Sequence, residues 1–167
     1  MPRSVLIFVL AVGIHLGNVR ADEAPQTATP TEFTVRPIGY VQKVGDRTVI
    51  NIDKRYQEGL LGLEHWSHIQ VLWWFDKNDT PEKRAILQVH PRGDAKNPLT
   101  GVFATRSPFR PNLIALSLCK IVSVKNNVIE VEKIDAFEGT PVLDIKPYAP
   151  EQDSAAEVRV PDWTKPR

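Results

Sequence analysis

Short segments with the two-residue periodicity of β-strands recur along this 167-residue sequence, and they constrain the fold more than any other feature. Such segments, bounded by Gly, Pro, Asn or Asp, are typical of strands. We expect strands at residues 33–41, 47–52, 68–75, 85–90, 114–124, 127–134 and 141–148. Past residue 21 no window shows a long 3.6-residue repeat, and only residues 54–66 favour a helical turn or a short helix. The pattern predicts a mostly β, antiparallel sandwich or barrel.

The segment boundaries also predict turns. Gly45-Asp46 is typical of a tight turn between two strands, and Lys125-Asn126 is expected to join the strands at 114–124 and 127–134 as a hairpin. Pro37 lacks a backbone N–H, so its strand is expected to lie at an edge or to contain a bulge.

The N-terminus has the features of a secretory signal peptide. Arg3 precedes an almost wholly apolar stretch, residues 4–17, and short side chains near Ala21 predict cleavage before Asp22. We therefore expect a signal peptide (1–21), a flexible linker (22–32), one folded domain (33–150) and a C-terminal tail (151–167). The protein would be exported to the periplasm or secreted, with no membrane anchor after cleavage. An uncleaved anchor is the alternative.

Composition argues against several classes of protein. With 42% hydrophobic and 25% charged residues the chain is an ordinary globular protein. Cleavage at residue 21 would leave 19 Lys and Arg against 20 Asp and Glu, whereas general nucleic-acid binders have a basic surplus. The single cysteine, Cys119, excludes a disulfide within the chain and reads as a small buried hydrophobe.

Motifs for common chemistry are absent. There is no GxSxG and no glycine-rich phosphate loop. His65, His68 and His90 are too few and too scattered for a typical zinc site, so we expect no metal, although a metal-dependent enzyme using these three is a third hypothesis.

Three segments depart from simple strand-and-turn patterns. In residues 104–112, Pro108 and Pro111 stiffen a loop whose two arginines have no acid beside them, which suits a carboxylate or phosphate. In residues 135–148 an acidic residue lies within an apolar strand. In residues 66–79 a hydrophobic strand ends abruptly at two charged residues. Each of these, taken singly, is also compatible with a solvated loop, an ion-paired rim or a surface turn.

Together these segments resemble the TsaA-like β-barrel family, whose characterised members are S-adenosylmethionine-dependent methyltransferases. Those enzymes methylate N6 of the threonylcarbamoyl-adenosine beside the anticodon of certain tRNAs. The resemblance covers nearly all of residues 34–150 and is most specific in GVFATRSPFRPN and GTPVLDIKPY. It implies a compact single-domain antiparallel barrel, a homodimer, S-adenosylmethionine as cofactor, and tRNA as partner in the cytoplasm.

The resemblance also implies site residues. Those expected to contact the methyl donor are Gln57, Asp76, Lys77, Arg106, Leu116, Ala136, Phe137, Glu138 and Gly139. Methyl transfer depends mainly on alignment of the reacting atoms, so no catalytic residue is firmly assigned. Asp144 and Tyr148 are weak candidates for orienting or deprotonating an acceptor.

Two departures from the family pattern lead to an alternative hypothesis. The sequence reads RPNLIALS where the usual pattern is RPNPIGLS, so Leu113 and Ala115 replace a proline and a glycine. An exported chain would also lack tRNA and S-adenosylmethionine. The alternative is an exported, non-enzymatic barrel that binds a small anionic or nucleoside ligand.

Overall fold

The computed structural model describes residues 32–165. The chain divides into two units, Met1–Thr34 and Val35–Arg167, and every helix and strand of the described residues lies in the second. The expected signal peptide and residues 22–31 of the expected linker lie outside the described residues, and so both remain predictions. Within residues 32–165 no helix is long and apolar enough to cross a membrane.

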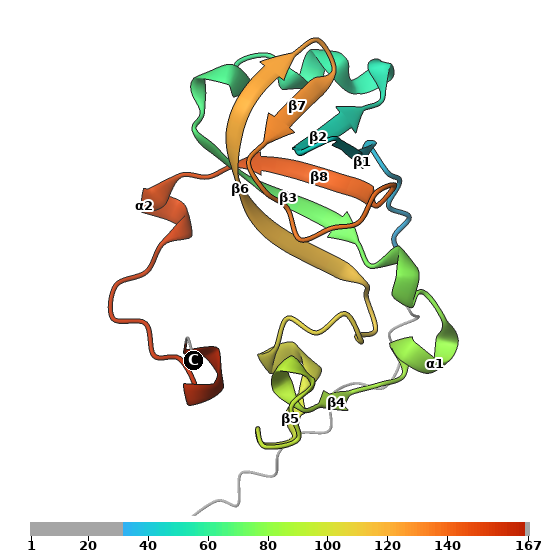
Figure 1. The fold of residues 1–167 in the computed structure, drawn as a ribbon, viewed down its shortest axis with the longest axis vertical. Helices are drawn as coiled ribbons and strands as arrows, with labels where there is room; N and C mark the ends of the chain where they lie inside the picture. Colours follow the sequence, from blue (N-terminus) through green and yellow to red (C-terminus); the bar gives the residue numbers. More distant parts are fainter. Residues whose placement is uncertain (1–31, 166–167) are drawn as a thin grey trace, which may run out of the picture. The chain divides into compact units, whose positions relative to one another are not determined.

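Six antiparallel strands close into a barrel, which confirms the barrel prediction and makes the described domain mostly β (Figure 1). Their order around the barrel is β1-β2-β7-β6-β3-β8. The strands are β1 (Gly39–Val44), β2 (Arg47–Ile52), β3 (His68–Trp74), β6 (Ile114–Lys125), β7 (Val128–Val131) and β8 (Pro141–Pro147). Closure leaves the barrel without exposed sheet edges, because β1 pairs with β8.

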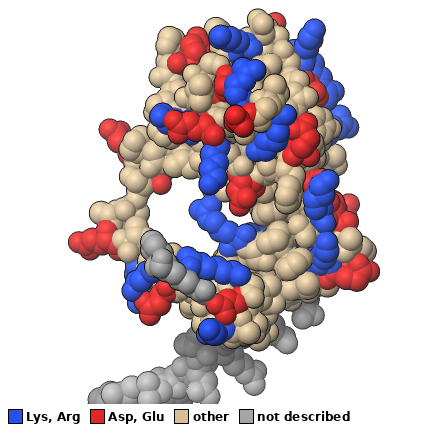
Figure 2. All heavy atoms as spheres, in the orientation of Figure 1, with Lys and Arg blue, Asp and Glu red and all other residues tan. Residues whose placement is uncertain are grey.

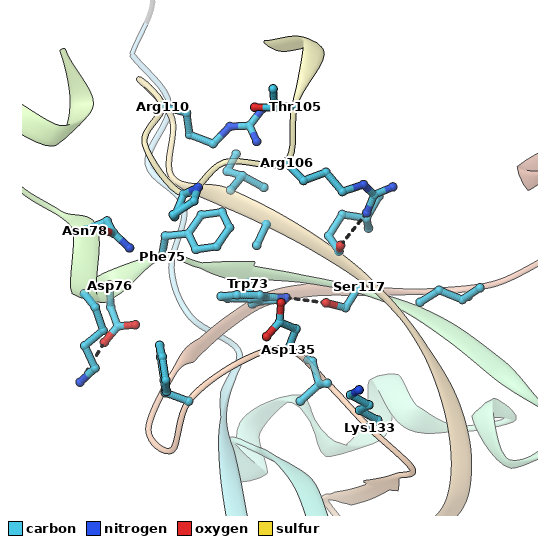
Figure 3. A pocket seen from close by; sticks show the side chains of 18 residues that line it. Trp73, Phe75, Asp76, Asn78, Thr105, Arg106, Arg110, Ser117, Lys133 and Asp135 are labelled. Atoms are coloured by element: carbon cyan, nitrogen blue, oxygen red, sulfur yellow. Dashed lines mark hydrogen bonds and ion pairs between the residues drawn. The ribbon is translucent and has the colours of Figure 1, made fainter. Parts of the chain in front are cut away.

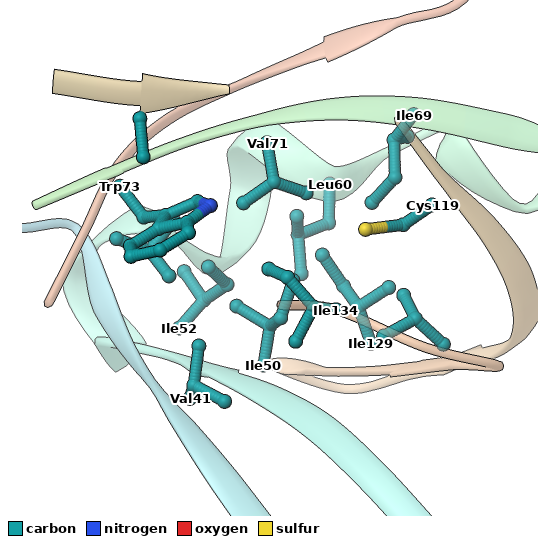
Figure 4. Close-up of a cluster of buried hydrophobic side chains, with 13 residues drawn as sticks. Val41, Ile50, Ile52, Leu60, Ile69, Val71, Trp73, Cys119, Ile129 and Ile134 are labelled. Carbon is teal, nitrogen blue, oxygen red and sulfur yellow. The ribbon is translucent and has the colours of Figure 1, made fainter. Parts of the chain in front are cut away.

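The barrel core follows from the alternation of each strand. Ile69, Val71 and Trp73 on β3 are buried while their neighbours are half-exposed. Figure 4 shows these side chains meeting buried residues of β1, β2, β6 and β7 inside the barrel. Cys119 lies among them at 1% exposure, and burial raises the pKa of its thiol to about 11. The thiol is therefore protonated at neutral pH, as expected for a structural cysteine.

Both expected turns are present. Gly45 has φ 60° in the β1–β2 hairpin, a backbone conformation that favours glycine. Asn126 has φ 54° between β6 and β7. A side chain at Gly39 would place its Cβ 2.3 Å from the carbonyl oxygen of Asn51, so this position in β1 permits only glycine.

The long connection between β3 and β6 provides the loops of the site. It contains η3 (Asp76–Asn78), α1 (Pro81–Arg84), η4 (Pro91–Gly93) and η5 (Val102–Ala104), with a two-stranded sheet of β4 (Gln88–Val89) and β5 (Thr100–Gly101). The helical signal at 54–66 corresponds to the short 3-10 helices η1 (Lys54–Leu60) and η2 (Leu63–His65). The chain after β8 holds α2 (Pro150–Asp153) and η6 (Asp162–Thr164).

Candidate functional site

A cleft of about 730 Å³ opens where β3 ends and β6 begins (Figure 3). We call it the first cleft. Three parts of the chain line it: the end of β3 with η3, the loop before β6 with the first residues of that strand, and the segment that follows β7. Its volume is within the range of small-molecule sites, roughly 300–1,000 Å³.

The floor of the first cleft is fixed by β3 and β6. The Phe75 amide donates to the Leu113 carbonyl at 2.9 Å, which joins the end of one strand to the start of the other. The Trp73 indole N–H donates to Ser117 Oγ at 3.0 Å, and the Trp73 and Phe75 rings meet edge to face at 4.7 Å. Since both rings are held, they form a preformed apolar wall.

The loop of residues 105–110 forms the opposite wall and is ordered by short-range hydrogen bonds. Thr105 Oγ1 donates to the Val102 carbonyl at 3.0 Å and accepts from the Ser107 amide at 3.2 Å. Ser107 Oγ accepts from the Phe109 amide at 3.1 Å. Arg106 then reaches β6, where its Nη1 donates to the Leu116 carbonyl at 3.1 Å. The loop thus presents its arginines from a fixed backbone.

A second set of contacts braces the far end of this loop. Arg84 on α1 donates through Nη1 to the Pro111 carbonyl at 2.9 Å and through Nε to Asp79 at 2.8 Å. Asp79 also accepts from the Trp74 indole N–H at 3.0 Å. The Arg84 and Trp74 hydrogen bonds hold the pKa of Asp79 below its ordinary value. The brace therefore depends on the ionised carboxylate.

Both basic and acidic groups line the first cleft. Arg106 and Arg110 project from the loop, and neither forms an ion pair with any residue of 32–165. Asp76 is 3.7 Å from Lys77, while Asp135 lines the cleft near Trp73 (Figure 3). Guanidinium groups that have no ion-pair partner and share a cleft with aromatic side chains suit a ligand that joins a carboxylate to a planar ring.

Five of the expected donor contacts line the first cleft: Asp76, Lys77, Arg106, Leu116 and Phe137. They come from three different parts of the chain, and the barrel brings them together. No measurement identifies the donor contacts, so their assignment remains a prediction.

Four expected contacts do not line this cleft. Ala136 packs against the barrel core, and the Glu138 carboxylate accepts from the Lys43 amide. Gly139 adopts φ 77° in the turn before β8. Gln57 is exposed on η1, and its neighbours line a separate cleft of about 460 Å³.

The weak catalytic candidates lie away from the first cleft. Asp144 pairs with Lys146 at 2.9 Å and lines the separate cleft beside η1. The Tyr148 ring meets the His68 ring edge to face at 6.5 Å. Asp144 lies in the middle of β8 and Tyr148 directly follows this strand, and both positions fit structural roles.

The histidines give the metal hypothesis no support. In residues 32–165 no group of three or more His, Cys, Asp or Glu side chains is placed to hold a metal ion. His68 Nδ1 is 2.9 Å from Ser67 Oγ, and His90 Nδ1 donates to the Asn97 carbonyl at 2.8 Å.

Several cleft residues were not expected from the sequence. Trp73 and Ser117 belong to strands and Phe75 directly follows β3, so in the sequence all three read as core residues. Lys133 and Asp135 were missed because they follow β7 and reach the cleft only in the folded barrel, where β7 lies beside β6. Their sequence signal was weak: two charged residues between a strand and the Glu138-Gly139 turn.

A family model provides the first comparison with known proteins. The tRNA-methyltransferase O N-terminal domain matches residues 31–154 of this chain. The match contains the whole barrel and the first cleft.

Individual relatives agree. A probable S-adenosyl-L-methionine-binding protein of Methanocaldococcus jannaschii is 50% identical over 121 residues, which cover 72% of this chain and 96% of that protein. The human tRNA (adenine(37)-N6)-methyltransferase is 44% identical over 119 residues, covering 69% of this chain and only 26% of that protein.

A solved structure has the same fold. The crystal structure of TrmO from Pseudomonas aeruginosa superposes with a TM-score of 0.64 at 29% identity, covering 83% of this chain and 64% of that one. This chain therefore spans less than two thirds of TrmO. Fold, family model and curated relatives agree: the chain belongs to the TrmO family, with the fold of the tRNA-methyltransferase O N-terminal domain.

Proposed function

We propose that this protein is an S-adenosylmethionine-dependent methyltransferase whose acceptor is the N6 position of an adenosine beside the tRNA anticodon. The observation that supports it best is the first cleft, which two arginines without acidic partners line together with a fixed pair of aromatic rings. The curated relatives support both halves of the proposal, since one is named a probable S-adenosyl-L-methionine-binding protein and another a tRNA (adenine(37)-N6)-methyltransferase.

The side chains that line the first cleft suit the chemical groups of S-adenosylmethionine. The Arg106 and Arg110 guanidinium groups suit its carboxylate, to which arginine forms two parallel hydrogen bonds. Trp73 and Phe75 provide apolar surface for its adenine. The Asp135 carboxylate suits its ammonium or sulfonium charge.

The chain's contribution to the reaction is placement. The bound donor supplies a methyl group that is already electrophilic because it is attached to a positively charged sulfur. Trp73, Phe75 and Arg106 hold their positions through hydrogen bonds and ring contacts within the protein. Such preorganisation fixes the line along which an acceptor nitrogen must approach.

Calorimetric titration of the full chain with S-adenosylmethionine tests the proposal. We expect saturable binding, weakened roughly tenfold to a hundredfold by Arg106→Ala, because a hydrogen bond to a charged group contributes about 1.5–3 kcal/mol. Arg47→Ala is the matched control, since Arg47 lies outside the first cleft, 3.9 Å from Glu130. No binding at millimolar donor contradicts the proposal. If the Arg106→Ala variant binds S-adenosylmethionine as tightly as the parent chain, Arg106 does not hold the carboxylate.

One observation favours a second candidate, an exported non-enzymatic barrel that binds a small anionic or nucleoside ligand. The Ala115 methyl group lines the first cleft where the family pattern has glycine. The predicted signal peptide also favours this candidate, because a chain that carries it would leave the cytoplasm. Fractionation of the native cells, with the mass of the mature N-terminus, separates the two: an intact cytoplasmic chain favours the methyltransferase, and a chain cleaved before Asp22 favours the exported barrel.

A further inference from the structure

A second cleft of about 1160 Å³ lies on the other side of the loop at residues 105–108. Three aromatic side chains line it: Phe103, Phe109 and Trp163. Phe103 is 77% exposed, while Phe109 is half-buried. Exposed aromatic rings in a cleft are the usual means of stacking an unpaired nucleotide base.

The second cleft also favours an anion. His90, Arg92 and Arg106 line it, and among the described residues its lining includes no Asp or Glu. Figure 2 shows basic side chains along the opening between the C-terminal segment and the rest of the described chain. Aromatic surface next to positive charge matches a base and its phosphate more closely than it matches a neutral apolar ligand.

Arg92 links the second cleft to the C-terminal segment. Its Nη2 donates to the carbonyl oxygens of Thr164 and Lys165, both at 3.1 Å, and so positions η6 with Trp163 at the cleft. The Arg92 backbone has φ 61°, a left-handed conformation that residues other than glycine adopt rarely. Through these Arg92 hydrogen bonds, the second cleft has aromatic side chains from two segments that are far apart in sequence: Phe103 and Phe109 from one, and Trp163 from the other.

The two clefts adjoin at one short stretch. Thr105, Arg106 and Pro108 line both of them, so a chain lying in the second cleft passes directly beside the first. We propose that the second cleft binds an unstacked nucleotide of a single-stranded RNA, with its base on Phe103 and Trp163 and its phosphate near Arg92. The inference rests on the proposed function: the nucleotide held there is a neighbour of the adenosine that is methylated.

Two variants at one exposed position, Phe103, test the nature of the occupant. The full chain is titrated with a labelled single-stranded RNA of an anticodon-loop sequence, and fluorescence anisotropy gives the affinity. Phe103→Leu keeps apolar surface but removes the stacking ring, and we expect about a tenfold loss of affinity, at the lower end of the effect of one stacked base. Phe103→Tyr keeps the ring and is expected to bind like the parent. Leu61→Ala, an exposed apolar residue at 91% exposure outside this cleft, is the control.

Calorimetry with S-adenosylmethionine on the same variants separates the two proposals. Phe103 does not line the first cleft, so donor binding should be unchanged in all of them. If the Leu and Tyr variants bind the RNA with the same affinity and still bind S-adenosylmethionine, the nucleotide site is overturned but the proposed function is not. Absence of donor binding in the parent chain contradicts the proposed function instead. If Phe103 provides only apolar surface and no stacking, both variants should bind the RNA as tightly as the parent chain. That result also overturns the inference.

Discussion

Ala115 is the residue at which this chain and its family pattern differ within the first cleft. Its side chain is 5% exposed and lies on β6 opposite Trp73. Ala115→Gly removes a methyl group from the cleft wall and allows a ligand to approach the backbone more closely. We expect a several-fold gain in affinity for S-adenosylmethionine by calorimetry.

The same change should lower stability, because glycine within a strand costs roughly 0.5–1 kcal/mol relative to alanine. Urea unfolding measures this cost. A stability loss without any gain in donor affinity would mean that the alanine does not restrict the cleft. Leu113→Pro is a useful comparison, because this substitution restores the other residue of the family pattern. Leu113 is fully buried and does not line the first cleft.

At the same scale, the sequence located the site only in part. Arg106 and Asp76 could be found because an arginine in a proline-containing loop and an acid at a strand end are visible locally. Trp73 and Ser117 could not, since both alternate like ordinary strand residues and their hydrogen bond spans 44 positions in sequence. Asp135 depends on the path of the chain after β7, which no local pattern specifies.

Among the elements, α1 braces the loop of the first cleft through Arg84, Asp79 and Trp74. Asp79 has a lowered pKa in the folded state, chiefly through the Arg84 hydrogen bond. A lowered pKa means that the ionised form stabilises the fold above the ordinary value of 3.8, and that this stability is lost as pH falls below it.

Asp79→Asn should therefore lower stability at neutral pH and have little effect well below pH 3.8. The difference at pH 7 is expected to be at most about 1 kcal/mol, since solvent screens a carboxylate that is 41% exposed. Thermal melting of parent and variant between pH 2.5 and 7 measures it. A constant difference across that range would show that the charge of Asp79 does not stabilise the brace.

Element boundaries show where local reasoning fails. The strand at residues 47–52 was predicted with its bounds, because both of its ends are marked by turn residues or charge. The strand expected at 33–41 instead begins at Gly39, since Pro37 has no N–H to donate and the ladder starts after it. The strand expected at 85–90 shrinks to β4 and lies outside the barrel, where only β5 is available to pair with it.

For the whole molecule, the outer face of β6 bears on the question of a homodimer. Ile114, Leu116, Leu118 and Val122 are each at least 40% exposed and alternate with buried residues along one strand. A row of exposed apolar side chains on one strand is typical of an interaction surface. The first three also line the first cleft, so a second copy on this face would add surface to this cleft.

Leu118→Asp tests this homodimer, because it places a charge in the middle of the apolar row without touching the barrel core. We expect the parent chain to sediment as a dimer in analytical ultracentrifugation and the variant as a monomer at micromolar concentration, since a carboxylate buried without a partner opposes association strongly. Leu99→Asp is the matched control, as Leu99 is 57% exposed and Leu118 is 55% exposed. Donor affinity should fall together with dimer formation. An unchanged sedimentation coefficient would place any interface elsewhere, and a monomeric variant with full donor affinity would show that one copy of the chain completes the site.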